Sequence, residues 1–288
     1  MKKIVIASLA ALLALPTFAE DDQWREDAGT DFGGRVSAEI DKKLAKGLHS
    51  FANGEFRFND NFGNFSRYQG TAGVSYKVND YLKTAVSYTF IENKKTKDST
   101  DIWKSRHRFT FDLTGSYRIG DFKLSLRERF QVTHRTDDVN EYQDNKNACV
   151  LRSRFMAQYK GLSDWTPYAY VDVRNTLNAP KWSYKYDNGI FHSITDSTHI
   201  DSTNFQGNKD VYINRVRLGL GAEWEVSKQH SFDFFVLYDF CFDRDIDVKK
   251  KSKIKKDGTV KYNKNDLESV LYRKSRNVSI GIGYKFSF

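Results

Sequence analysis

The amino-acid sequence predicts an all-β protein: an antiparallel transmembrane β-barrel of about 12 strands (10–12), with short periplasmic turns and longer extracellular loops. Its 16 Tyr and 22 Phe against only 3 Pro suit pleated strands better than a disordered chain. No apolar run beyond the N-terminus is long enough for a membrane-spanning helix. The rest of the chain alternates apolar and polar residues with the period of two of a strand that has one apolar face.

The N-terminal segment, residues 1–19, is predicted to be a secretory signal peptide. Two lysines supply its positive start, an apolar stretch follows, and small residues mark a cleavage site after Ala19. We interpret residues 20–31 as an N-terminal periplasmic segment or a short strand. Residues 32–288 are predicted to form the outer-membrane β-barrel.

Eleven segments show the strand alternation. In the first, Phe32, Val36 and Ile40 share one parity, while Arg35 and Glu39 share the other. The segments are roughly 32–42, 48–58, 66–78, 81–92, 103–119, 122–134, 148–160, 166–177, 209–226, 231–243 and 270–288. Short connections alternate with longer polar ones, and the longer ones lie near 59–65, 93–102, 135–147, 178–208 and 244–269. This alternation of connection length is typical of outer-membrane barrels.

An odd number of segments conflicts with the even strand number that is usual in single-chain bacterial barrels. We therefore expect a further short strand within Gln23–Asp31, which makes twelve, whereas the loss of one segment would make ten. Without either change, and with the short turns on the periplasmic side, residues 32–42 would run parallel to the last strand.

Alternation alone also fits a secreted sandwich or a lipocalin-like barrel, in which the apolar face points inward. Three features favour a barrel in the cell outer membrane: many arginines on the polar face, aromatic residues near the strand ends, and a final strand that alternates up to a C-terminal phenylalanine. We expect Val36, Leu113, Val236 and Ile282 to face lipid. The predicted assembly signal, read by the barrel-assembly machinery, comprises Tyr284, Phe286 and Phe288.

The polar face is predicted to line a narrow lumen filled by side chains. Its basic cluster comprises Arg106, Arg108, Arg127, Arg129, Arg152, Arg154, Arg174, Arg215 and Arg217. Its predicted acidic partners are Glu39, Glu55, Asp112, Asp172, Asp233 and Asp239. Because few acids lie on the arginine-rich strands, those on the flanking strands are expected to reach across the lumen. Two interpretations stay open: a salt-bridged interior that closes the barrel, or a basic constriction that selects small anionic solutes.

Enzyme chemistry has little support, so we predict a protein that is not an enzyme and binds no metal or cofactor. The sequence contains neither a His-Glu-x-x-His motif nor a Gly-rich phosphate loop. The alternative is an outer-membrane lipid hydrolase with a lipid-side Ser/His site. For that site, His107 is expected opposite His134, with Glu128 and Ser153 on the same parity. A bulge at Glu128 would instead turn this carboxylate inward.

The strongest charge run, Lys249–Lys256, lies in the last long loop. It is either a solvated loop or the site of a surface-binding protein that contacts outer-membrane lipid and lipopolysaccharide phosphates through basic extracellular loops. The formal net charge of +9 would also suit nucleic acid. A secreted barrel meets no cellular DNA, so no nucleic-acid partner is expected.

Two arginine-rich segments, Trp103–Tyr117 and Phe122–Arg135, carry a resemblance to a known family, and shorter stretches support it: Phe56–Asp60, Leu151–Phe155 and His230–Asp233. Over nearly all of the mature chain, the sequence resembles the domain-of-unknown-function 2490 family, uncharacterised barrels of Bacteroidetes-type, Gram-negative bacteria. The resemblance implies an outer-membrane barrel and no firm activity. The function expected is therefore a structural outer-membrane barrel or a narrow, porin-like, arginine-lined pore.

Overall fold

The computed structural model describes residues 26–97, 100–139, 143–182, 205–254 and 260–288. The predicted signal peptide lies outside the described residues, as does the middle of the predicted loop 178–208. Among the described residues, no helix is long and apolar enough to cross a membrane.

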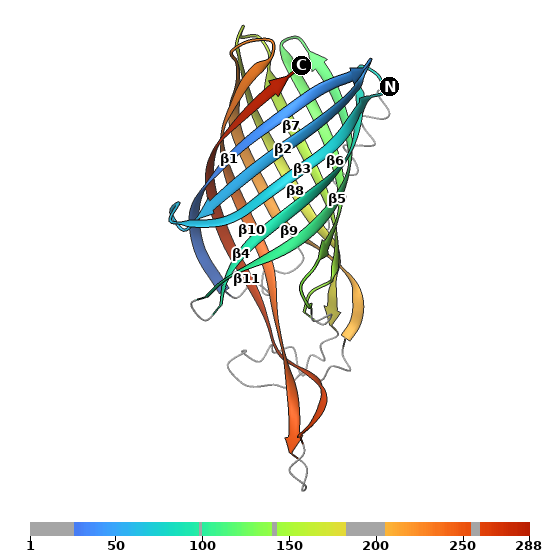
Figure 1. Ribbon diagram of the computed structural model, residues 1–288, viewed down its shortest axis with the longest axis vertical. Helices are drawn as coiled ribbons and strands as arrows, with labels where there is room; N and C mark the ends of the chain where they lie inside the picture. The colour runs from blue at the N-terminus through green and yellow to red at the C-terminus, as the bar shows by residue number, and fades with distance from the viewer. Residues whose placement is uncertain (1–25, 98–99, 140–142, 183–204, 255–259) are drawn as a thin grey trace.

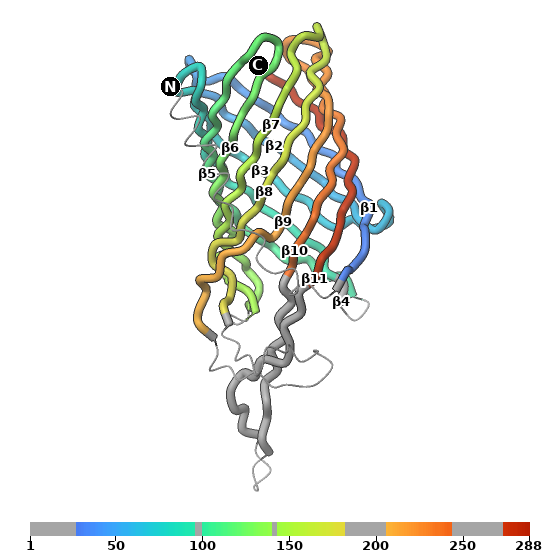
Figure 2. Tube along the Cα trace, turned by 180° about the vertical axis from the view of Figure 1, so that it is seen from behind, coloured from blue at the N-terminus to red at the C-terminus, as the bar shows by residue number. Residues whose placement is uncertain are grey.

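The described chain forms one closed barrel of eleven strands, in which sequence neighbours pair antiparallel and β1 closes on β11 (Figure 1). The strands are β1 (Glu26–Ala45), β2 (Leu48–Asn59), β3 (Asn64–Lys77), β4 (Leu82–Lys97), β5 (Thr100–Ile119), β6 (Phe122–Arg135), β7 (Asn147–Tyr159), β8 (Trp165–Trp182), β9 (Phe205–Glu225), β10 (His230–Ile254) and β11 (Val260–Ser287). They run obliquely to the long axis of the barrel, as Figure 2 shows from behind.

The expectation of twelve strands is wrong, because Glu26–Asp31 lengthens β1 instead of turning back as a separate strand. The register of β1 against β11 shifts between Asp27 and Thr30, where Gly29 has a φ of 81°. This bulge allows the chain to continue in the same direction. Because ten antiparallel pairings join the eleven strands, the first and last strands point the same way, so β1 and β11 pair in parallel.

The predicted alternation of faces is confirmed. Large apolar side chains stand on the outer face, where Val36 is 47% and Val236 is 48% exposed. Polar and charged side chains point inward, where Asp172 is 0% and Asp239 is 3% exposed. This polarity is the inverse of the lipocalin-like alternative, in which the apolar face would point into the barrel.

Aromatic side chains gather on the outer face near both ends of the strands. At the short-turn end, Trp165 stacks on Trp224 with ring centroids 5.6 Å apart. Toward the long-loop end, Trp103 lies 5.4 Å from Tyr68 and 5.6 Å from Phe65. The sequence-based expectation of aromatic residues at the strand ends is confirmed.

Two of the predicted long loops are largely strand. The segment 93–102 forms the paired ends of β4 and β5, and most of 244–269 forms the paired ends of β10 and β11. Outside the barrel wall neither face of a strand pair has to be apolar, so the period-two signal disappears while backbone pairing continues. The alternation therefore located the barrel wall and missed the hairpins that extend from it.

Candidate functional site

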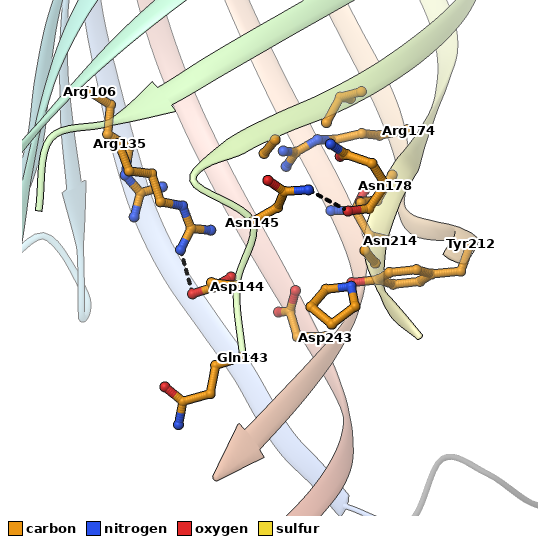
Figure 3. Close-up of a pocket in the computed structure, with 15 residues that line it drawn as sticks. Arg106, Arg135, Gln143, Asp144, Asn145, Arg174, Asn178, Tyr212, Asn214 and Asp243 are labelled. Carbon is orange, nitrogen blue, oxygen red and sulfur yellow. Dashed lines mark hydrogen bonds and ion pairs between the residues drawn. The ribbon is translucent and has the colours of Figure 1, made fainter. Parts of the chain in front are cut away.

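Two cavities lie inside the described part of the barrel. The larger, which we call the inner chamber, has a volume of about 550 Å³ and lies in the short-turn half, where Asn53, Thr89 and Lys285 line it. The smaller, the mouth pocket, has a volume of about 280 Å³ and lies at the long-loop end, where Arg106 and Arg135 line it (Figure 3). The two cavities share no lining residue.

A ring of arginines separates the two halves of the lumen. Each of these residues lies nine to eleven positions from the short-turn end of its strand, which places them at a similar depth. We call this ring the arginine layer, and its members are Arg35, Arg57, Arg67, Arg108, Arg174 and Arg215.

The members of the arginine layer are close enough to repel one another. Arg57 and Arg174 both repel Arg108, and Arg57 and Arg108 both repel Arg67. Two carboxylates form ion pairs with members of the layer, Glu55 with Arg57, and Asp239 with Arg35 and Arg215, and Asp243 attracts Arg174. The layer therefore has an excess of positive charge.

Two members of the layer bond to neutral groups. The Nε of Arg108 donates a hydrogen bond of 3.0 Å to Oγ1 of Thr133, and the Nε of Arg67 donates one of 2.5 Å to Oδ1 of Asn93. Guanidinium groups held in this way keep donors that can bind a carboxylate or phosphate in a bidentate manner.

A second set of arginines, on the adjacent wall, is tied to acids. Arg129 makes a bidentate pair with Asp112 at 2.6 and 2.6 Å. Asp172 accepts hydrogen bonds from Arg152 at 2.9 Å and from Arg154 at 3.0 Å. Arg217 binds Asp239 at 2.6 Å. We call these seven residues the ion-paired belt.

The nine predicted lumenal arginines all lie on inward positions, but the structure brings only part of the set to acids. In the described parts of the chain, Arg106, Arg108 and Arg127 form no ion pair with an acid, and Arg174 is attracted by Asp243. The predicted acids also do not reach across the lumen. Glu39 pairs with Lys285 on the adjacent strand at 3.0 Å, Glu55 pairs within its own strand, and Asp233 accepts a 2.7 Å hydrogen bond from Tyr168. Glu39 and Glu55 are therefore satisfied on the adjacent strand or on their own strand, whereas Asp233 reaches past β9 to Tyr168 and Asp239 reaches past β11 to Arg35.

The sequence analysis missed three members of the layer, Arg35, Arg57 and Arg67. Each falls on the polar parity of its strand, so the alternation was sufficient to place it inside. Its distance from the short turn could be counted along the strand, but whether arginines at that distance form one layer depends on how the strands close into the barrel.

The residues of the hydrolase alternative do not come together. His107 does lie opposite His134, as the turn predicted. The register of β6 is continuous at Glu128, so no bulge turns it inward, and it accepts a 2.6 Å hydrogen bond from Ser153. His134, six residues farther along the strand, bonds to Asn147 instead. Among the described residues, the structure shows no histidine bonded to Ser153 as its base, and the absence of enzyme activity stays a prediction.

The C-terminal residues proposed as the assembly signal lie at the short-turn end. Tyr284 is hydrogen-bonded to Nδ1 of His230 at 2.7 Å, and the ring of Phe286 stacks on that of Phe288 at 5.3 Å. The backbone N–H of Phe288 donates to the carbonyl of Asp41 on β1, so the last residue helps to close the barrel. Their role in assembly stays a prediction.

Residues 36–249, from β1 into β10, match the family described as protein of unknown function, DUF2490. The chain belongs to this family. The resemblance drawn from the sequence is confirmed, and the match covers every member of the arginine layer except Arg35. A search of curated proteins finds no match to this DUF2490 barrel.

Proposed function

We propose that this DUF2490 barrel is an outer-membrane protein whose lumen gives small anions a narrow path past the arginine layer. The observation that carries the proposal is the charge of that layer, where six arginines face two paired carboxylates. Rings of Arg or Lys favour anions in pores because a fixed positive charge offsets part of the cost of removing the solute from water.

Placement in a membrane is supported by the polarity of the wall. A closed barrel has no unpaired sheet edge, so every strand can satisfy its backbone in lipid. The outer face exposes large apolar side chains such as Phe109, at 61%, and Leu220, at 63%. In water, barrels with such an apolar surface would associate with one another. In a bilayer the apolar band contacts the hydrocarbon core, and the aromatic rings near both strand ends lie at the two interfaces. The predicted signal peptide would direct the chain to secretion.

The ion-paired belt supports the path by fixing the wall around it. Asp172 and Asp239 hold arginines from neighbouring strands in place. Asp239 also pairs with Arg35 and Arg215 of the layer, so one carboxylate of the belt helps to position the layer. A solute that enters the layer would exchange contacts from one guanidinium group to the next, which requires that each contact be weak enough to release. The partners we propose are outer-membrane lipid, lipopolysaccharide at the long-loop rim, and the barrel-assembly machinery.

The test of the path is conductance of the purified chain in a planar bilayer with a salt gradient. We expect the reversal potential of the unaltered chain to have the sign that chloride selectivity gives. In the double variant Arg67→Gln, Arg108→Gln, the reversal potential should shift toward zero. The matched control is Arg118→Gln, which removes an exposed arginine at the short-turn end. A folded barrel that conducts nothing would reject the path and leave the structural role.

Membrane placement needs its own measurement. The chain expressed in a Gram-negative host should sediment with the outer membrane and resist extraction by carbonate. Recovery in the soluble periplasmic fraction, with the barrel folded, would contradict the location.

A further inference from the structure

We infer that the mouth pocket binds a small hydroxylated acid that carries one negative charge, a sugar acid being the closest fit to its groups. The binding site lies at the long-loop end and is lined by residues of β5 to β10 and of the segment before β7. It stands apart from conduction, because binding there requires no passage through the arginine layer.

In the part of the chain that the structure describes, two buried polar atoms of the pocket have no hydrogen-bond partner. The Nε of Arg106 is a donor, and Oδ1 of Asn214 is an acceptor. Buried polar groups in folded proteins are nearly always hydrogen-bonded, so each of these two atoms requires a partner, which is water or a group of a bound solute. The donor can bind an anionic or carbonyl oxygen, and the acceptor can bind any O–H or N–H donor, such as a hydroxyl group of the proposed ligand. Acetate offers only the first of these groups, and a neutral sugar lacks the charge.

The charge of the pocket sets the charge of the ligand. Arg106, Arg135 and Arg174 face Asp144 and Asp243, which leaves one positive charge in excess. Arg135 forms an ion pair with Asp144, and Asp243 attracts Arg174. Arg106 is attracted by Asp137 and Asp144 but forms no ion pair with either in the described structure. A single carboxylate matches this balance better than a doubly charged phosphate does.

The shape of the pocket is fixed by its own hydrogen bonds. Figure 3 shows Arg106 and Arg135 on one side, facing Arg174, Asn214 and Tyr212 on the other. The Nδ2 of Asn145 donates a 3.0 Å hydrogen bond to the carbonyl of Asn178, and Oδ1 of Asn178 accepts a 2.7 Å hydrogen bond from the backbone of Cys149. These amides tie the segment before β7 to the end of β8.

A volume of about 280 Å³ is enough for one sugar ring and lies just below the usual range for drug-sized ligands. Tyr212 and Pro180 contribute apolar surface that a ring can cover. The guanidinium group, the amide acceptor and this apolar surface together form a site for a carboxylate attached to a hydroxylated ring.

The test is calorimetric titration of the purified chain in detergent with four probes: glucuronate, glucose, acetate and glucose 6-phosphate. Glucuronate should bind at least tenfold more tightly than glucose or acetate, and more tightly than glucose 6-phosphate. Arg106→Gln and Asn214→Ala should each weaken glucuronate binding at least tenfold, while the control Arg118→Gln leaves it unchanged.

The opposite results would overturn the inference. Equal binding of glucose would remove the role of charge, and equal binding of acetate would remove the role of the hydroxyl groups. Tighter binding of glucose 6-phosphate would overturn the single-charge assignment. If no probe binds to a chain whose heat-resistant gel mobility shows a folded barrel, water alone fills the pocket. Conductance is measured separately, so failure of the pore proposal and failure of this site are distinguishable.

Discussion

The ion-paired belt and the arginine layer use the same residue type on the same inner wall, yet their surroundings differ. In the belt, every arginine lies on an acid: Asp112, Asp172 or Asp239. In the layer, Arg67 and Arg108 rest on neutral amide and hydroxyl groups. The spacing of arginines along a strand is therefore no guide to their role. The position of the nearest carboxylate separates a structural arginine from one that can serve a solute.

The largest effect is expected at the centre of the belt. Asp172→Asn leaves Arg152 and Arg154 without their shared carboxylate, in a place where the acid is fully buried. Breaking a buried ion pair costs about 3–5 kcal/mol because the remaining charge is left uncompensated. We expect a lower temperature for the loss of heat-resistant gel mobility and a lower urea midpoint.

The matched control for that variant is Asp80→Asn. Asp80 lies in an exposed short turn, where a hydrogen bond from Lys77 lowers the pKa of its carboxyl. The control should leave the urea midpoint unchanged. A shift at Asp172 no larger than the shift at Asp80 would remove the belt from the stability of the barrel.

A smaller effect on the free energy of unfolding should distinguish the belt from the layer when one arginine of each is replaced by glutamine. Arg217→Gln removes the bidentate partner of Asp239 and should lower the free energy of unfolding by roughly 1.5–3 kcal/mol, the range for hydrogen bonds to charged groups. Arg108→Gln removes a repelled charge and should leave that free energy unchanged or slightly higher. Equal destabilisation by both variants, measured by urea unfolding, would erase the distinction.

The smallest expected effect is on salt dependence. Ions that enter the lumen screen the repulsion within the layer. Added chloride should therefore raise the melting temperature of the unaltered chain by roughly 2–4 °C, the equivalent of about 1 kcal/mol for a chain of this size. The rise should shrink in the Arg67→Gln, Arg108→Gln double variant. A rise that is just as large in the double variant would place the salt effect elsewhere on the protein.

The alternation of side chains made the barrel and its two faces predictable. Val36 outside and Asp239 inside follow from parity alone, and the family followed from the arginine-rich segments. The strand number did not follow, because a bulge near Gly29 extends β1 where the usual even count calls for a new strand. The parity of a residue predicts the face of the sheet on which it lies but does not predict where a strand ends.

The candidate site was only half predictable for a related reason. The sequence placed Arg108 and Arg174 in the lumen but did not bring Arg35, Arg57 and Arg67 to the same depth. That depth arises from the accumulated stagger of the strands around the closed barrel. The ion pair of Asp112 with Arg129 was within reach of the sequence, because the turn between β5 and β6 sets one register that also places His107 opposite His134.

The parallel seam between β1 and β11 separates the ends of the described chain. Glu26 lies at the long-loop end and Phe288 at the short-turn end, whereas a barrel with an even number of antiparallel strands returns both ends to one side. An epitope placed before Glu26 and another placed after Phe288 would be accessible to antibodies from opposite sides of any bilayer that the barrel crosses. The same fold could display a passenger peptide at one face while keeping a purification handle at the other.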